Sequence, residues 1–149
     1  MYYDHPKGLR TLFFTEMWER MSYYGMRGIL VLFMTASIAD GGLDFNNVSA
    51  SAIYGIYAAA VYLATLPGGW IGDTILGQQK TILYGGIIIM FGHLMLAIPN
   101  MNFFYLGLIL VVVGTGLLKP NISAIVGGLY HNNPSMREAG FTIFYMAIN

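Results

Sequence analysis

Four long apolar stretches, separated by short polar segments, dominate the sequence. A helix needs about 20 residues to cross the roughly 30 Å hydrocarbon core of a bilayer. Each of the four stretches meets or nearly meets that length, and the first is long enough to tilt or to protrude. The pattern therefore predicts four transmembrane helices, at about 12–38, 51–71, 81–98 and 104–126.

A fifth apolar segment opens near Phe141, within residues 137–149, and the sequence stops at Asn149. The connections between the stretches are rich in Gly, Pro, Asn and Asp, which are typical of turns. We therefore expect an all-α integral membrane protein with four complete transmembrane helices and the start of a fifth. We also expect the chain to be part of a longer protein, because the fifth segment is incomplete.

Composition supports a membrane protein and excludes several classes of site. Hydrophobic residues make up 56% of the chain and charged residues 9%, far below the roughly 25% of a soluble domain. Seven Lys and Arg balance seven Asp and Glu, so nothing indicates nucleic-acid binding. The chain has no cysteine, which excludes disulfides and thiolate metal sites within it.

The distribution of loop cations predicts the orientation in the membrane. Lys7 and Arg10 precede the first predicted helix, Lys80 lies between the second and third, and Arg137 follows the fourth. All of these positions fall on one side of the membrane, and the opposite loops carry no Lys or Arg. Because short cytoplasmic loops accumulate Lys and Arg, we expect the N-terminus to be cytoplasmic, in a multi-pass protein of the cell membrane.

Five ionisable residues lie inside the predicted spans, where a charge costs roughly 2.5–3.5 kcal/mol on insertion scales. Such residues are rare and usually mark a path for ions, protons or substrate. Buried ion pairs can also serve folding specificity alone, but five charges on two helices favour a functional site. They are Glu16, Glu19, Arg20 and Arg27 in the first span and Lys119 in the fourth.

Helical spacing and depth predict how these charges pair. Glu16 and Arg20 are four residues apart, so their side chains can meet on one helix face. Arg20 and Lys119 both lie about 10–12 Å from the cytoplasmic ends of their helices, so we expect Lys119 to approach Glu16 or Glu19. Arg27 has no acidic partner on either helix, so we expect it to face water, another part of the protein or an anionic ligand.

The same residues resemble a known signature. Glu16-x-x-Glu19-Arg20, followed by Tyr23-Tyr24-Gly25, resembles the ExxER and YYG pattern on the first helix of proton-dependent oligopeptide transporters, a branch of the major facilitator superfamily. Residues 68–77 resemble the first family signature and overlap the Gly/Asp loop of the superfamily, although Gln78 and Gln79 replace two usual basic residues. Residues 141–149 resemble the second family signature.

This resemblance implies a major-facilitator-type helical bundle, of which residues 1–149 would form part of the N-terminal half. It implies proton-coupled symport of di- and tripeptides, with protons as the coupling ion and no other cofactor. An acidic anchor for the peptide amino group would come from the C-terminal half. By position, the resemblance assigns proton coupling to Glu16, Glu19, Arg20 and Lys119, peptide binding to Tyr23, Tyr24, Arg27, Tyr62, Lys119, Asn121 and Asn149, and the interdomain loop to Gly69, Asp73, Gly77 and Lys80.

Other functions remain open at this level. The chain could belong to a major-facilitator transporter of nitrate, a drug or a conjugate, or form a non-transporting helical subunit of a membrane protein. An enzyme is not indicated, because the sequence shows no nucleophile and base pair, metal cluster or phosphate-binding loop. His93 lies alone in the third predicted span, where a packed or hydrogen-bonded side chain is the expected role.

Overall fold

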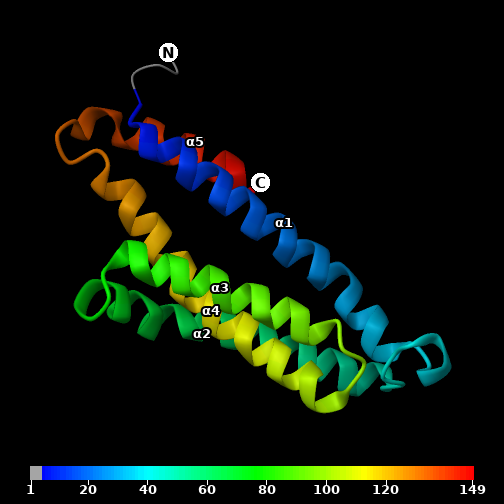
Figure 1. Cartoon of the computed structure of the whole chain (residues 1–149). Coiled ribbons are helices and arrows are strands. Elements are labelled where there is room, and N and C mark those ends of the chain that lie inside the picture. Colours follow the sequence, from blue (N-terminus) through cyan, green and yellow to red (C-terminus); the bar gives the residue numbers. More distant parts are fainter. Residues whose placement is uncertain (1–4) are drawn as a thin grey trace.

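The structure is a computed structural model that describes residues 5–149, and helices account for nearly all of this part of the chain (Figure 1). Two short 3₁₀ turns, Ile38–Asp40 and Pro134–Met136, lie in the connections before α2 and α5. The five α-helices are α1 (Lys7–Thr35), α2 (Asn47–Thr74), α3 (Gln78–Leu96), α4 (Met101–Gly128) and α5 (Arg137–Ile148).

The helix ends follow local capping chemistry. The side chain of Asn46 accepts a hydrogen bond from the backbone N–H of Ser49 at 2.8 Å, and Asn100 caps α4 in the same way through Asn102 at 2.9 Å. Gly77 precedes α3 with φ 80°, in the left-handed region that favours glycine. These caps fix where the connections end and the helices begin.

A helix lies at each of the predicted apolar stretches, but the helices do not begin and end where those stretches do. The first helix begins at Lys7 rather than near residue 12, and it ends at Thr35 rather than at residue 38. Ala36 turns to an extended backbone, and Ser37 caps a separate 3₁₀ turn. Helices α2 and α4 extend beyond both ends of their apolar stretches, because polar residues can continue a helix after the apolar pattern stops.

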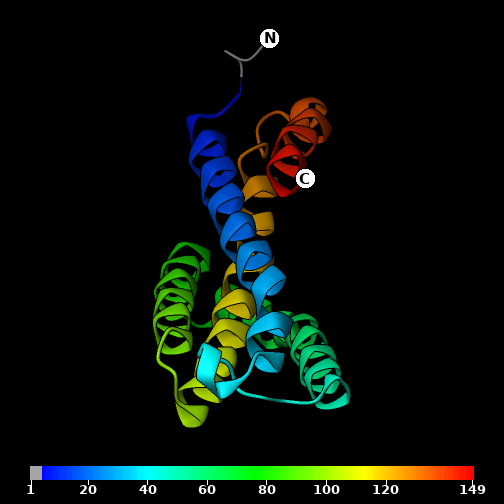
Figure 2. The same ribbon diagram turned by 90° about the vertical axis from the view of Figure 1, so that its right-hand side faces the viewer.

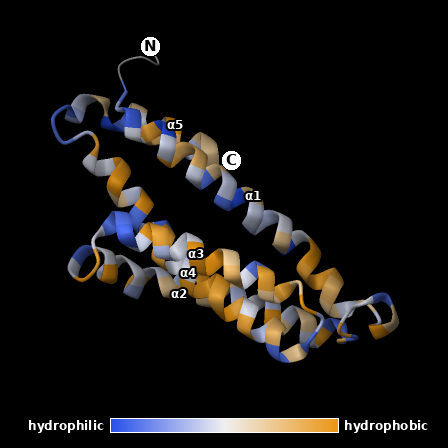
Figure 3. Cartoon of the chain, viewed as in Figure 1, coloured by the Kyte–Doolittle hydropathy of each residue, from blue (hydrophilic) through white to orange (hydrophobic). Residues whose placement is uncertain are grey.

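Three helices, α2, α3 and α4, are long and apolar enough to cross a membrane, judged by length and composition. Helix α1 has 29 residues, but the charges along its length set it apart from this group. Figure 3 shows this difference: hydrophilic turns interrupt α1, whereas α4 is mostly hydrophobic.

Helix α4 is the centre of the bundle, with α2 and α3 packed on it (Figures 1 and 2). Glycines permit this packing: a Cβ on Gly68 would lie 1.9 Å from the backbone oxygen of Gly116, and one on Gly114 would lie 2.7 Å from that of Gly85. Such contacts between backbones are typical of helices that associate in membranes. The result is a closely packed unit of three helices.

Helix α1 packs mainly along α5 and makes smaller contacts with α2 and α4 (Figures 1 and 2). Two clusters of buried apolar side chains join the helices. One includes Tyr23, Met34 and Phe104, and the other includes Ile122 and Phe144. The contacts of α1 bring its polar face toward the other helices.

We predict that Gly68→Ala destabilises the protein by roughly 1–3 kcal/mol, the usual range for overpacking, because the new methyl group meets the backbone of α4. The matched control is Gly55→Ala in the same helix, where an added Cβ would meet nothing within 4 Å. Thermal unfolding of both variants in detergent measures the difference. Equal unfolding temperatures for Gly68→Ala and the wild type would contradict the close α2–α4 contact.

Candidate functional site

Three charged side chains of α1 form a buried cluster. The relative exposures of Glu16, Glu19 and Arg20 are 1%, 8% and 5%. Arg20 donates two hydrogen bonds to Glu19, from Nε to Oε2 at 2.5 Å and from Nη2 to Oε1 at 2.8 Å. Arg20 Nε is also 3.5 Å from Glu16 Oε1, so the expected pair four residues apart is present. The bidentate contact with the adjacent Glu19 is the closer of the two.

The cluster carries two carboxylates against one guanidinium. Glu16 Oε2 is buried and has no hydrogen-bond partner among residues 5–149. A buried, unpartnered carboxylate oxygen is costly when ionised, and a proton on it removes that charge. The arrangement therefore favours a carboxyl group that can exchange a proton.

The expected approach of Lys119 to these carboxylates does not reach ion-pair distance in this structure. Among residues 5–149, no carboxylate lies within 4.0 Å of Lys119, and its Nζ lies 5.8 Å from the centroid of the Tyr62 ring. Helix α4 packs more extensively on α2 and α3 than on α1. The two carboxylates therefore share one cation, Arg20, at ion-pair distance among residues 5–149.

Aromatic side chains surround Arg20. Its Cζ lies 4.8 Å from the ring centroid of Tyr23 and 5.8 Å from that of Tyr24. Tyr23 is buried, whereas Tyr24 is 51% exposed. The two adjacent tyrosines thus have different surroundings: one ring belongs to the core, and the other is accessible.

Arg27 lies two turns further along α1 and is exposed. It forms no ion pair with the described residues 5–149, and its Cζ lies 5.2 Å from the ring centroid of Tyr54. The ring holds the guanidinium through a cation–π contact without neutralising it. Its hydrogen-bond donors are therefore available to an anionic group.

The other expected binding residues do not share one environment. Tyr62 is 69% exposed, and Asn149 is exposed, with its Nδ2 donating to the backbone oxygen of Tyr145 at 3.1 Å. Asn121 is buried, and its Nδ2 donates to the backbone oxygens of Gly68 and Leu117 at 3.0 and 2.6 Å. In this structure Asn121 therefore joins α2 to α4 rather than lining an open surface.

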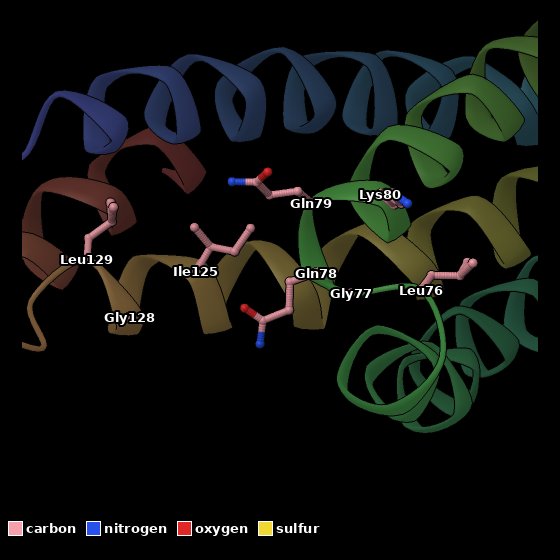
Figure 4. Close-up of a pocket in the computed structure, with 8 residues that line it drawn as sticks. All are labelled: Leu76, Gly77, Gln78, Gln79, Lys80, Ile125, Gly128 and Leu129. Carbon is pink, nitrogen blue, oxygen red and sulfur yellow. The ribbon is translucent and has the colours of Figure 1, made fainter.

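The Gly/Asp signature occupies the last turns of α2 and the short connection to α3: Gly69 and Asp73 lie in α2, Gly77 precedes α3, and Lys80 lies in its first turn. Asp73 is exposed, and its Oδ1 accepts a hydrogen bond from Gln78 Nε2 at 3.4 Å, whereas Gly69 packs near Pro120 of α4. An open pocket of about 460 Å³ lies at this end of the bundle, between the start of α3 and the end of α4, and Figure 4 shows the residues that line it. Its lining residues are Leu76, Gly77, Gln78, Gln79, Lys80, Ile125, Gly128 and Leu129.

Sequence reasoning missed three side chains near the charges. Ser22 Oγ and His93 Nε2 are 2.6 Å apart, which joins α1 to α3 and confirms a hydrogen-bonded role for His93. Tyr54 lies beside Arg27, and Tyr57 stacks on Tyr23. The three tyrosines within residues 51–71 are visible in the sequence and suit contacts with cations. Which tyrosine lies beside which cation depends on how the helices are rotated about their axes. In residues 5–149, no group of three His, Cys, Asp or Glu side chains is placed to hold a metal ion.

Comparisons with known proteins agree on one family. The model of the POT family matches residues 79–149. An uncharacterised transporter of Bacillus subtilis is 52% identical over 99% of this chain, and a di-/tripeptide transporter of Lactococcus lactis is 50% identical over the same share. In both cases the chain spans 30% of the relative's length.

Solved structures of POT family transporters resemble this chain in fold. A crystal structure of a peptide transporter POT in complex with sulfate has a TM-score of 0.94 and 50% identity, covering 99% of this chain and 30% of that one. A POT family transporter in complex with 5-aminolevulinic acid has a TM-score of 0.95 and 42% identity, covering 99% of this chain and 31% of that one. The helices of this chain are thus arranged as in those transporters.

We predict that Arg20→Gln destabilises the protein by roughly 3–5 kcal/mol, because it leaves two buried carboxylates without their cation. Arg27→Gln is the matched control, since Arg27 is exposed and makes no ion pair with the described residues. Thermal unfolding in detergent is the measurement. Similar losses in the two variants would argue against a structural role for the cluster.

Proposed function

We propose that this chain, which is similar to transporters of the POT family, forms the N-terminal part of a transporter that moves di- and tripeptides with protons by alternating access. The observation that carries the proposal is the buried cluster of two carboxylates and one guanidinium, with Glu16 Oε2 left unpartnered. A group of this kind can bind and release a proton within a bundle of apolar helices.

The proposed membrane arrangement has α1 as a fourth span and α5 as the start of a fifth. The buried charges of α1 face the bundle, which lets the helix cross hydrocarbon despite its composition. Lys7, Arg10, Lys80 and Arg137 would lie on the cytoplasmic side, so the N-terminus would be cytoplasmic in the cell membrane. The C-terminal half of the transporter would complete the pathway.

In the proposed mechanism, the proton binds to the carboxylates of Glu16 and Glu19 and loosens their contacts with Arg20. Lys119 lies over the ring of Tyr62 in this structure. In another conformation it would approach the carboxylates and replace the contact with Arg20 that protonation breaks. The change of partners would bias the rocking of the two halves of the transporter. Asp73, Gly69, Gly77 and Lys80 would lie at the cytoplasmic contact between those halves.

The proposed peptide site lies where side chains remain accessible. Arg27 offers a guanidinium that can bind a carboxylate through two hydrogen bonds, and Lys119 offers a second positive charge. The hydroxyls of Tyr24 and Tyr62 and the amide of Asn149 can bind the peptide backbone. Tyr23 and Asn121 would support this surface from behind, because both are buried. The C-terminal half would supply the acidic partner of the peptide amino group.

A second candidate substrate class is a small zwitterion without a peptide bond. A family member whose structure resembles this chain was crystallised with 5-aminolevulinic acid. That molecule also carries a carboxylate and an amino group, so Arg27 could serve it in the same way. Competition between 5-aminolevulinic acid and labelled dialanine for uptake would distinguish a shared site from a peptide-specific one.

We predict that Glu19→Gln abolishes proton-driven uptake of labelled dialanine by the complete transporter in proteoliposomes, because the amide cannot exchange a proton with the cluster. Counterflow exchange of dialanine, which needs no net proton movement, should persist. Glu138→Gln on the exposed start of α5 is the control and should transport as the wild type does. Uphill uptake by Glu19→Gln at the wild-type rate would refute the proton-coupling role.

We predict that Arg27→Gln raises the KM for dialanine roughly tenfold or more, the effect of losing a charged hydrogen bond of about 1.5–3 kcal/mol. Dialanine amide, which has no carboxylate, should bind the wild type and the variant with similar affinity. Competition with labelled dialanine in proteoliposomes measures both ligands. An equal loss of affinity for the acid and the amide would show that Arg27 does not bind the peptide carboxylate.

A further inference from the structure

Three cations of the bundle each lie over at least one tyrosine ring, and helix α2 is involved every time. It supplies Tyr54 and Tyr62 directly, and a third tyrosine of α2, Tyr57, stacks on Tyr23, the nearer of the two rings beside Arg20. A cation within about 6 Å of a ring centroid is attracted by the electrons of the ring face. The distances to the ring centroids are 4.8 Å for Arg20 and Tyr23, 5.2 Å for Arg27 and Tyr54, and 5.8 Å for Lys119 and Tyr62.

Tyr57 is held firmly within the core. It is 4% exposed and belongs to a buried apolar cluster that includes Val61 of α2 and Leu108 and Val111 of α4. Its hydroxyl has no hydrogen-bond partner in the described structure. The ring of Tyr57, rather than its hydroxyl, therefore makes the contacts that the structure shows.

The ring of Tyr57 stacks on Tyr23, with centroids 6.4 Å apart and planes inclined by 26°. This geometry lies within the range of favourable aromatic pairs. Tyr23 is buried in turn, and it faces the guanidinium of Arg20. Tyr57 thus supports Tyr23 from the side of α2.

The orientation of the Arg20 guanidinium decides how it binds the carboxylates. A bidentate contact requires the guanidinium and carboxylate groups to be nearly coplanar, so a ring packed on the guanidinium face helps to set that plane. Tyr23 provides such a ring, while Glu19 accepts both hydrogen bonds. A shift of Tyr23 would alter how Arg20 divides its contacts between Glu19 and Glu16.

We propose that Tyr57 is a positioning residue for the charged cluster: through Tyr23, it holds Arg20 in the orientation that binds Glu19 and approaches Glu16. The proposal rests on the proposed function, in which that cluster couples protons to transport. It gives α2 two roles, since the same helix presents Tyr62 beside Lys119. Tyr57 itself does not touch the peptide or the proton.

The test compares Tyr57→Leu with Tyr57→Phe in the complete transporter, using proton-driven uptake of labelled dialanine in proteoliposomes. Tyr57→Leu should lower the maximal rate about five- to tenfold, the scale of one lost cation–π or aromatic contact. The KM should change less than about twofold, because substrate binding is not altered. Tyr57→Phe keeps the ring and should transport as the wild type does, as should the control Leu63→Ala on the exposed face of α2.

A double-mutant cycle tests whether Tyr57 acts through Tyr23. Tyr57→Leu should have little further effect on the maximal rate in a Tyr23→Leu background, because the intermediate ring is already lost. If Tyr57→Leu is not monodisperse in detergent, Tyr57→Met replaces it, since the flexible thioether fills the space without a planar ring.

Several results would overturn the proposal. Equal losses in Tyr57→Phe and Tyr57→Leu would assign the effect to the hydroxyl, and a loss confined to KM would place Tyr57 in peptide binding. Additive effects in the double-mutant cycle would exclude an action through Tyr23. Normal transport by Tyr57→Leu would overturn this proposal alone, whereas a wild-type protein without proton-driven uptake would overturn the proposed function as well.

Discussion

The burial of the Arg20 guanidinium between two carboxylates is the constraint around which the other features of α1 are arranged. Two carboxylates and one guanidinium are tolerable in an apolar bundle when the cation and a proton offset the two negative charges and the groups share hydrogen bonds. Here the hydrogen bonds are divided unequally, because Glu19 takes a bidentate contact and one oxygen of Glu16 takes none. A small change in protonation can therefore redistribute the contacts without unfolding the helix.

The surrounding fold keeps this cluster in place through packing rather than through further charges. Helix α4 contacts α2 and α3 across glycines, and Asn121 ties its side-chain amide to the backbone of α2. The three helices thus form a scaffold against which α1 presents its charged face. The hydrogen bond between Ser22 and His93 adds a polar contact between α1 and that scaffold.

The sequence was sufficient to predict the order of the helices and three members of the charged cluster, Glu16, Glu19 and Arg20, but it also assigned Lys119 to that cluster. Apolar length alone identified each helix, and the spacing of Glu16 and Arg20 identified one ion pair. It could not predict that Lys119 would rest on Tyr62, because that depends on the distance between α1 and α4. The helix ends also differ from the ends of the apolar stretches. An apolar pattern marks a hydrophobic environment, whereas a helix ends where its backbone hydrogen bonds end.

Tyrosine rings, rather than carboxylates, lie beside Arg27 and Lys119, and this affects the electrostatic potential around the two cations. A ring face attracts a cation but leaves its full positive charge in place, unlike an ion pair. Arg27 and Lys119 therefore give this part of the molecule a positive potential, although the chain as a whole has a formal net charge of +0. Low-dielectric walls concentrate such a field and draw small anions toward it. An overall neutral chain can in this way present a locally cationic surface.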